Sequence, residues 1–207
     1  MRDDLTEIGL VIDKSGSMWS KGQDVIGGFN KFLAEQKALP GHANLTMVQF
    51  DTNYTMVHSG VDIQQVPELN EHTYIPGGLT ALLDAVARAV SDIGQRLANM
   101  PEDGRANKVI IVVMTDGEEN SSREQTKEGL KKIIEHQRDA YKWEFIFLGQ
   151  DIDAFGEAGS IGVGVHGTAQ SSSPKQSFAM SSMAIGCLRT TGDIGKAWKE
   201  EKDPEQS

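Results

Sequence analysis

The sequence contains a single cysteine, Cys187, among its 207 residues. One thiol cannot form a disulfide within the chain or supply a cysteine-rich zinc site, and it is compatible with a reducing compartment. The five histidines are scattered without the spacing of paired metal ligands, so we interpret them as ordinary surface or turn residues. These shortages exclude metal centres built on cysteine or on paired histidines.

The chain also lacks a long apolar run and an excess of positive charge. No stretch of 18 apolar residues occurs, and the start, Met-Arg-Asp-Asp, has no apolar signal region, so we expect a cytoplasmic protein without membrane insertion. The 30 acidic residues outnumber the 20 basic ones, which gives a formal net charge of −10. This charge repels phosphate backbones and favours cation binding, so we expect no nucleic-acid partner.

The length and the 38% hydrophobic content fit a single domain, which we expect over residues 1–192, followed by a charged, flexible tail at 193–207. Segments with strand character alternate with segments of helical periodicity along this length. The predicted strands cover residues 8–12, 45–50, 54–58, 109–113, 143–148 and 163–166. The predicted helices cover residues 21–37, 82–97, 152–158 and 177–189.

A fifth helix is expected after the strand at 109–113, because two overlapping capping boxes follow that strand. Ser121 with Glu124, and Ser122 with Gln125, both fit the pattern, so this helix should begin there and run through Ile134. The alternation predicts an α/β fold with a doubly wound, mostly parallel six-stranded sheet and helices on both faces. The turn cluster between residues 50 and 54 predicts a hairpin, which places one antiparallel strand at the edge.

Three polar stretches stand out against this frame. Asp13, Ser15 and Ser17 alternate directly after the first strand, Thr80 follows two glycines before a helix, and Asp116 follows the clearest buried strand. Parallel sheets bind ligands at the carboxyl ends of strands where the strand order reverses, so in the order 3-2-1-4-5-6 the three loops would converge. Hard oxygens at one point suit a small divalent cation. Taken singly, the first stretch could be a plain turn, and Thr80 could be a helix N-cap.

Together and in this order, D-x-S-x-S, the threonine of Gly-Gly-Leu-Thr-Ala-Leu and Thr-Asp-Gly-Glu resemble the metal-ion-dependent adhesion site of von Willebrand factor A domains. The resemblance covers about residues 6–170 and is closest to small, stand-alone bacterial or phage members. It implies a Mg²⁺ or Mn²⁺ ion whose open coordination position takes an Asp or Glu carboxylate from a partner protein. The implied metal ligands, direct or through water for the two carboxylates, are Asp13, Ser15, Ser17, Thr80 and Asp116.

The expected function is therefore that of a non-catalytic, metal-dependent protein-binding module. The rival is a Mg²⁺-dependent phosphotransferase or hydrolase with Asp13 as nucleophile. Against the rival, Ser15 stands where haloacid-dehalogenase-like phosphotransferases carry a second aspartate, and no positioned lysine or histidine is evident. A nucleotide-binding Rossmann relative would need G-x-G-x-x-G after the first strand, which this sequence does not supply.

Two further features leave alternatives open. Met18 and Trp19 flank the first polar stretch and could form an apolar rim for a partner or fold back as core. The helix at 177–189 has a core face of small and unbranched side chains, which define packing register weakly. It could shift when a partner carboxylate arrives, as the corresponding helix does in the resembling family, or it could be a static cover.

Overall fold

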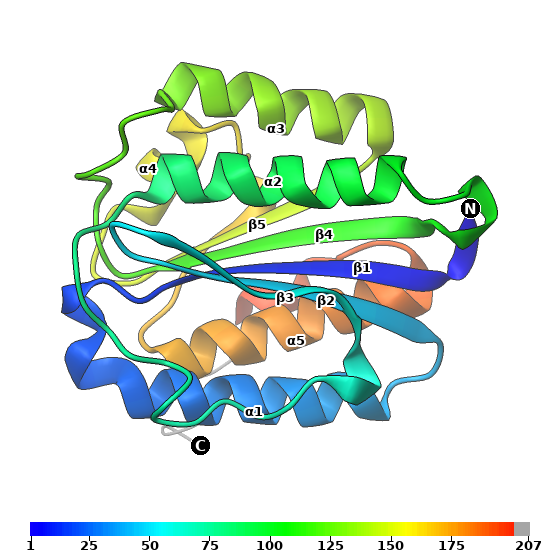
Figure 1. The fold of residues 1–207 in the computed structure, drawn as a ribbon, viewed down its shortest axis with the longest axis horizontal. Helices are drawn as coiled ribbons and strands as arrows, with labels where there is room; N and C mark the ends of the chain where they lie inside the picture. The colour runs from blue at the N-terminus through cyan, green and yellow to red at the C-terminus, as the bar shows by residue number, and fades with distance from the viewer. Residues whose placement is uncertain (201–207) are drawn as a thin grey trace.

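The computed structural model describes residues 1–200 of the chain, and Figure 1 shows a single twisted sheet between two layers of helices. The strand order is β3-β2-β1-β4-β5-β6, and neighbouring strands are parallel except for β2 and β3, which are antiparallel. This confirms the predicted doubly wound fold with one antiparallel edge strand. The strands are β1 (Arg2–Asp13), β2 (His42–Phe50), β3 (Tyr54–Asp62), β4 (Ala106–Thr115), β5 (Glu144–Gly149) and β6 (Thr168–Gln170).

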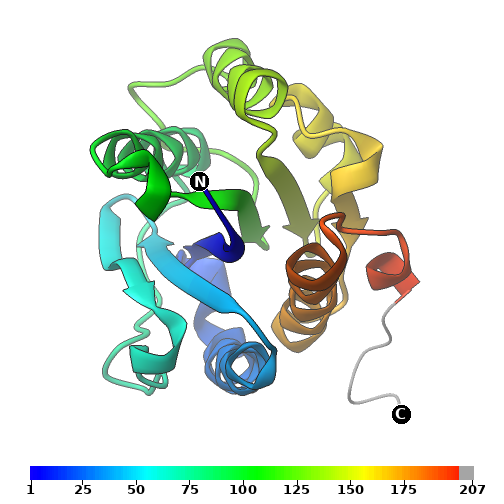
Figure 2. The same ribbon diagram turned by 90° about the vertical axis from the view of Figure 1, so that its right-hand side faces the viewer.

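The helices cover both faces of this sheet. In Figures 1 and 2, α1 and α5 lie side by side on one face, and α2 and α3 lie on the other. The α-helices are α1 (Gly22–Ala38), α2 (Leu82–Ala98), α3 (Lys127–Tyr141), α4 (Ala154–Ser160) and α5 (Pro174–Thr191). Short 3₁₀ helices are η1 (Gly16–Lys21), η2 (Ile63–Gln65), η3 (Glu102–Gly104), η4 (Val165–Gly167) and η5 (Ala197–Glu200).

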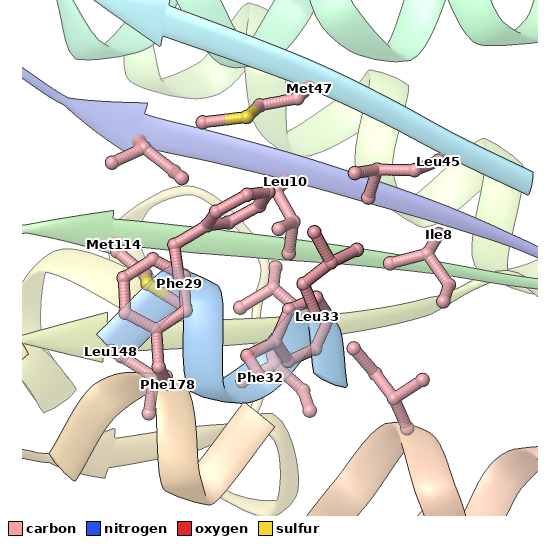
Figure 3. Close-up of a cluster of buried hydrophobic side chains, with 14 of the residues drawn as sticks. Ile8, Leu10, Phe29, Phe32, Leu33, Leu45, Met47, Met114, Leu148 and Phe178 are labelled. Carbon is pink, nitrogen blue, oxygen red and sulfur yellow. The ribbon is translucent and has the colours of Figure 1, made fainter. Parts of the chain in front are cut away.

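Strand β1 separates two apolar layers because its side chains alternate between the faces of the sheet. Ile8 and Leu10 enter the layer beneath α1 and α5, where Phe29, Phe32 and Phe178 pack together (Figure 3). Val11 enters the opposite layer beneath α2. Both layers are buried apolar cores, and together they hold the strand ends in fixed positions.

The predicted capping boxes at Ser121 and Ser122 are wrong, because α3 begins later, at Lys127. Its N-cap is Thr126, whose hydroxyl accepts a hydrogen bond from the Gly129 N–H at 3.1 Å. The backbone N–H groups of residues 121–125 instead donate to the carboxylates of Glu119 and Asp84. Glu119 is a near neighbour in the sequence, but Asp84 lies 39 residues before Arg123, and local capping patterns cannot reveal such a distant acceptor.

The last third of the chain also differs from the prediction in its boundaries. The last strand is Thr168–Gln170 rather than 163–166, because the glycine-flanked Val165–Gly167 segment forms a 3₁₀ turn in which Val165 is exposed. Helix α5 begins three residues early, at Pro174. Ser173 caps it by accepting from the Gln176 N–H, and proline fits the first helical turn.

The domain does not end at residue 192, so the predicted flexible tail at 193–207 is wrong over the part of the tail that the structure describes. Ile194 and Trp198 are buried in the core beneath α1 and α5, and Trp198 is fully inaccessible to solvent. Residues 201–207, the rest of that tail, lie outside the described residues. Among residues 1–200, no helix is both long and apolar enough to span a membrane.

Candidate metal centre

The candidate site lies where β1 and β4 end. The two strands are neighbours and parallel, and Ile12 stands opposite Met114. The residues that follow, Asp13 and Asp116, therefore emerge at the same edge of the sheet. This edge is also the point where the strand order reverses, as the sequence predicted for a doubly wound sheet.

The carboxylate of Asp13 is fully buried and held by two neutral donors. Its Oδ1 accepts from the Ser15 N–H at 2.7 Å, and its Oδ2 accepts from the Thr115 hydroxyl at 2.6 Å. Burial raises the pKa of Asp13 above its ordinary value, although these two hydrogen bonds oppose the rise. Sequence reasoning missed the role of Thr115, although β-strand alternation from Val113 points it to the same face as Asp13.

The two serines connect Asp13 to the second carboxylate. Ser15 Oγ and Ser17 Oγ lie 3.1 Å apart, and Ser17 Oγ donates to Asp116 Oδ1 at 2.5 Å. The chain leaves the strand and enters η1 at Gly16. This turn brings the Ser17 hydroxyl to Asp116. The first polar stretch is therefore more than a plain turn.

Thr80 approaches from the loop before α2. Its backbone N–H donates to Asn120 Oδ1 at 2.9 Å, and the Asn120 N–H donates back to the Thr80 carbonyl at 3.1 Å. The N-cap interpretation of Thr80 is wrong, because the N-cap of α2 is Ala81, and the N–H groups of Leu83 and Asp84 donate to the side chains of Glu119 and Ser122 instead. A Cβ on Gly117 would lie 3.1 Å from Thr80 Oγ1 and 3.7 Å from Ser17 Oγ. Glycine therefore keeps open the space that these two hydroxyls border.

A lysine that the sequence did not single out also reaches this site. Lys21, at the end of η1, donates from Nζ to Asp116 Oδ2 at 2.8 Å and to Asp151 Oδ2 at 2.7 Å. Burial lowers the pKa of Lys21, but the hydrogen bonds to the two carboxylates outweigh it and raise the pKa. Nothing in the local sequence relates Lys21 to Asp151, because they are 130 residues apart.

The donor set fits a small, hard cation. It consists of oxygens only, and three of them are neutral hydroxyls. The positively charged Lys21 ammonium already lies beside the Asp116 carboxylate. Within residues 1–200 no group of three or more His, Cys, Asp or Glu side chains is placed to hold a metal. A cation at this edge would therefore depend on the serine and threonine hydroxyls as well as the two aspartates.

Sequence comparison identifies the family. Residues 7–179 match the model of the von Willebrand factor type A domain. The chain belongs to this family. Its domains are generally interaction modules. No curated protein sequence matches the chain.

Several solved structures share the fold at low sequence identity. Proximal thread matrix protein 1 from the mussel byssus is 14% identical, with a TM-score of 0.62 over 89% of this chain and 46% of that one. The vWF domain of a type V pili tip protein from Porphyromonas gingivalis is 11% identical, with a TM-score of 0.64 over 92% and 98%. Manganese-loaded TRAP protein from Plasmodium vivax is 17% identical, with a TM-score of 0.57 over 83% and 70%. The chain thus spans less than half of the mussel protein.

Proposed function

We propose that this domain is a non-catalytic protein-binding module that engages an Asp or Glu side chain of a partner protein through a bound Mg²⁺ or Mn²⁺ ion. The hydroxyls of Ser15, Ser17 and Thr80 would hold the ion, with Asp13 and Asp116 acting directly or through water. When bound, the ion supplies a Lewis-acidic position for a carboxylate oxygen. The observation that carries this proposal is the convergence of these five oxygen-bearing side chains at the edge where β1 and β4 end.

The balance of charge in the donor set supports a binding role. Two carboxylates balance the charge of a divalent ion without exceeding it, and the three neutral hydroxyls donate weakly, so the ion stays receptive to a third carboxylate. Mg²⁺ retains water readily and prefers sites that are only partly built from protein. We therefore expect weak metal affinity in the absence of a partner.

The surface around these loops supports a partner that carries apolar residues beside its acidic one. The sequence left open whether Met18 and Trp19 form an apolar rim or belong to the core. Met18 is buried in the core, whereas its neighbour Trp19 is 68% exposed. Ile75 and Leu79 are also exposed, and their loop is hydrogen-bonded to the first polar stretch through the Gly16 N–H and the Gly78 carbonyl. Exposed large apolar side chains near one site are typical of interaction surfaces.

The environment of Asp13 argues against the alternative, a Mg²⁺-dependent phosphotransferase or hydrolase. A nucleophilic carboxylate needs an oxygen that the substrate can reach. Asp13 has no exposed surface, and each of its oxygens already accepts a hydrogen bond, from Ser15 and from Thr115. Its geometry suits a fixed electrostatic anchor better than an attacking group.

The test is calorimetric titration of the metal-free chain with MgCl₂ and MnCl₂, comparing wild type with Ser17→Ala and Ser121→Ala. Ser121 is the matched control, because it lies in a neighbouring loop and its buried hydroxyl has no hydrogen-bond partner. We expect one ion per wild-type chain, a loss of at least about tenfold in affinity for Ser17→Ala, and no change for Ser121→Ala. Equal affinities in all three chains would contradict the proposed ligands.

The open coordination position can be tested separately. Water-proton relaxation of the Mn²⁺-loaded chain reports water bound to the ion, and an added Asp-containing peptide should lower that relaxation by displacing water. Its Asn-containing counterpart is the control and should leave the relaxation unchanged. Identical behaviour of the two peptides would contradict carboxylate capture at the metal.

A further inference from the structure

Lys21 is held between two carboxylates that differ strongly in exposure. The Asp116 side chain is 1% exposed, whereas that of Asp151 is 76% exposed. The Lys21 ammonium lies 2.8 Å from the first and 2.7 Å from the second. Removing the partner of a buried carboxylate is costly because it leaves an uncompensated charge, whereas an exposed ion pair contributes little to stability. Lys21 thus contacts one carboxylate of the candidate metal set and one outside it.

We propose that Lys21 is a tethered counter-cation of the metal site, which neutralises Asp116 when no metal is bound and is transferred to Asp151 when metal enters. This rests on the proposed function and adds a control over the metal affinity of that same site. Lys21 and Asp151 thus share one role, although neither is a proposed metal ligand.

The geometry explains why both residues are needed. Asp116 Oδ1 accepts from Ser17, and its Oδ2 accepts from Lys21, so a divalent ion that uses Asp116 meets the ammonium as a competing positive charge. Like charges a few ångströms apart repel one another even when solvent screens them, so the ammonium would weaken metal binding. Because Asp151 already accepts from the same Nζ, the ammonium can leave Asp116 without losing its ionic partner.

Another lysine on the same group of loops provides a matched control. Lys14 lies between Asp13 and Ser15 in the sequence, but its Nζ pairs with Asp51 Oδ2 at 2.7 Å. Asp51 is not one of the proposed metal ligands. Removing the charge of Lys14 therefore changes the net charge of the region as much as removing that of Lys21, without freeing a metal ligand.

The experiment is a double-mutant cycle on Mg²⁺ affinity, measured by calorimetry, with Lys21→Met, Asp151→Asn, the double variant and Lys14→Met. We expect Lys21→Met to bind Mg²⁺ on the order of tenfold more tightly, and Lys14→Met to stay within about twofold of wild type. Asp151→Asn should weaken binding by about fivefold, because Lys21 then pairs with Asp116 alone. In the Lys21→Met background the same change should have less than about a twofold effect.

Each result decides the proposal. Equal tightening by Lys21→Met and Lys14→Met would show only a general charge effect and would overturn it, as would additive effects of Lys21→Met and Asp151→Asn. If wild type binds Mg²⁺ and Lys21→Met does not tighten binding, the counter-cation role fails while the proposed metal site stands. If none of the chains binds Mg²⁺ or Mn²⁺, the proposed function itself fails. Circular dichroism checks folding, and Lys21→Gln replaces Lys21→Met if that variant unfolds.

Discussion

The middle and the carboxyl end of β1 each bury a carboxylate, and the two carboxylates have different partners. Glu7 and Asp13 are six residues apart, so strand alternation places both on the face covered by α2, and neither has exposed surface. Glu7 pairs with Arg96 of α2 at 2.5 Å and accepts from the Thr46 hydroxyl at 2.9 Å. Asp13 accepts instead from an N–H and a hydroxyl, both of them neutral donors.

The difference separates a structural charge from one that suits a ligand. A buried charge is costly unless it is paired, and Glu7 has a charged partner, Arg96, in the same chain. Burial raises the pKa of both carboxyl groups, so the difference lies in their partners: Asp13 is held by neutral dipoles alone. The same strand thus carries an internal ion pair near its middle, and at its carboxyl end a carboxylate that an external cation would stabilise.

The largest loss of stability is expected when the Glu7–Arg96 ion pair is broken. Glu7→Gln removes the charge but leaves Arg96 buried against a neutral amide, and breaking a buried pair in this way typically costs about 3–5 kcal/mol. Urea unfolding of Glu7→Gln should show this loss. The double variant Glu7→Leu with Arg96→Met should recover most of it, because neither charge then remains. A loss below about 1 kcal/mol for Glu7→Gln would mean that the pair contributes little.

At Asp13, a neutral substitution should affect metal binding far more than the stability of the fold. Asp13→Asn keeps an oxygen that can accept from Ser15 or Thr115, so in EDTA we expect its free energy of unfolding to stay within about 1 kcal/mol of wild type. Mg²⁺ binding should fall below calorimetric detection. If Asp13→Asn destabilises the metal-free chain as much as Glu7→Gln does, the two carboxylates of β1 do not differ in their structural role.

A smaller effect is expected in the pH dependence of stability. The folded-state pKa of Asp13 is raised above its ordinary value of 3.8, so folded chains retain a proton that unfolded chains have released. Stability from this proton is full below about pH 4 and is lost as the pH rises through the raised pKa. In EDTA, the unfolding free energy of wild type should therefore fall relative to Asp13→Asn above pH 4. A difference that stays flat between pH 4 and 7 would contradict the raised pKa.

Much of the fold follows from local sequence patterns. The five β-branched residues 109–113 specify a strand buried on both faces, and the periodicity of 82–97 specifies α2 to within one residue. The errors arise where distant side chains decide local structure. The Asp84 carboxylate accepts from the N–H of Arg123, 39 residues away, where a helix was expected, and burial of Trp198 fixes a segment whose charged composition suggested a flexible tail.

The candidate site likewise contains residues that local sequence patterns predict and residues that they do not. The five proposed ligands were predictable because each follows an apolar run or opens a helix, and the sheet order then brings their loops to one edge. Lys21 and Thr115 were not found. Thr115 sits inside a strand motif and makes its contact across to β1, while Lys21 contacts Asp116 and Asp151, which are 95 and 130 residues away. Such contacts depend on tertiary packing and leave no periodic signal.

The C-terminal helix offers the test with the smallest expected change. Helix α5 is fastened to α1 by polar contacts that its sequence did not reveal. Gln36 Nε2 donates to the Ser182 carbonyl at 3.0 Å, and the Arg189 guanidinium donates to the Gln36 carbonyl at 2.6 Å. The ring of Phe178 packs so closely that a Cβ on Gly28 would lie 2.7 Å from it. These contacts define the helix register, although its small and unbranched core face does not, and they favour the static cover over the shifting helix.

We therefore expect hydrogen exchange across residues 174–191 to stay unchanged when Mg²⁺ and an Asp-containing peptide are both bound, because a shift of α5 would have to break the Gln36 and Arg189 hydrogen bonds together. Exchange by mass spectrometry checks this, with the loop at 14–21 as the internal control that should gain protection at the metal. A Gln36→Ala variant sharpens the test, since removing that side chain takes away contacts to both Ser182 and Arg189. If α5 loses protection on peptide binding in wild type, the helix responds to the site and is not a static cover. If it does so only in Gln36→Ala, then Gln36 is what holds α5 in register.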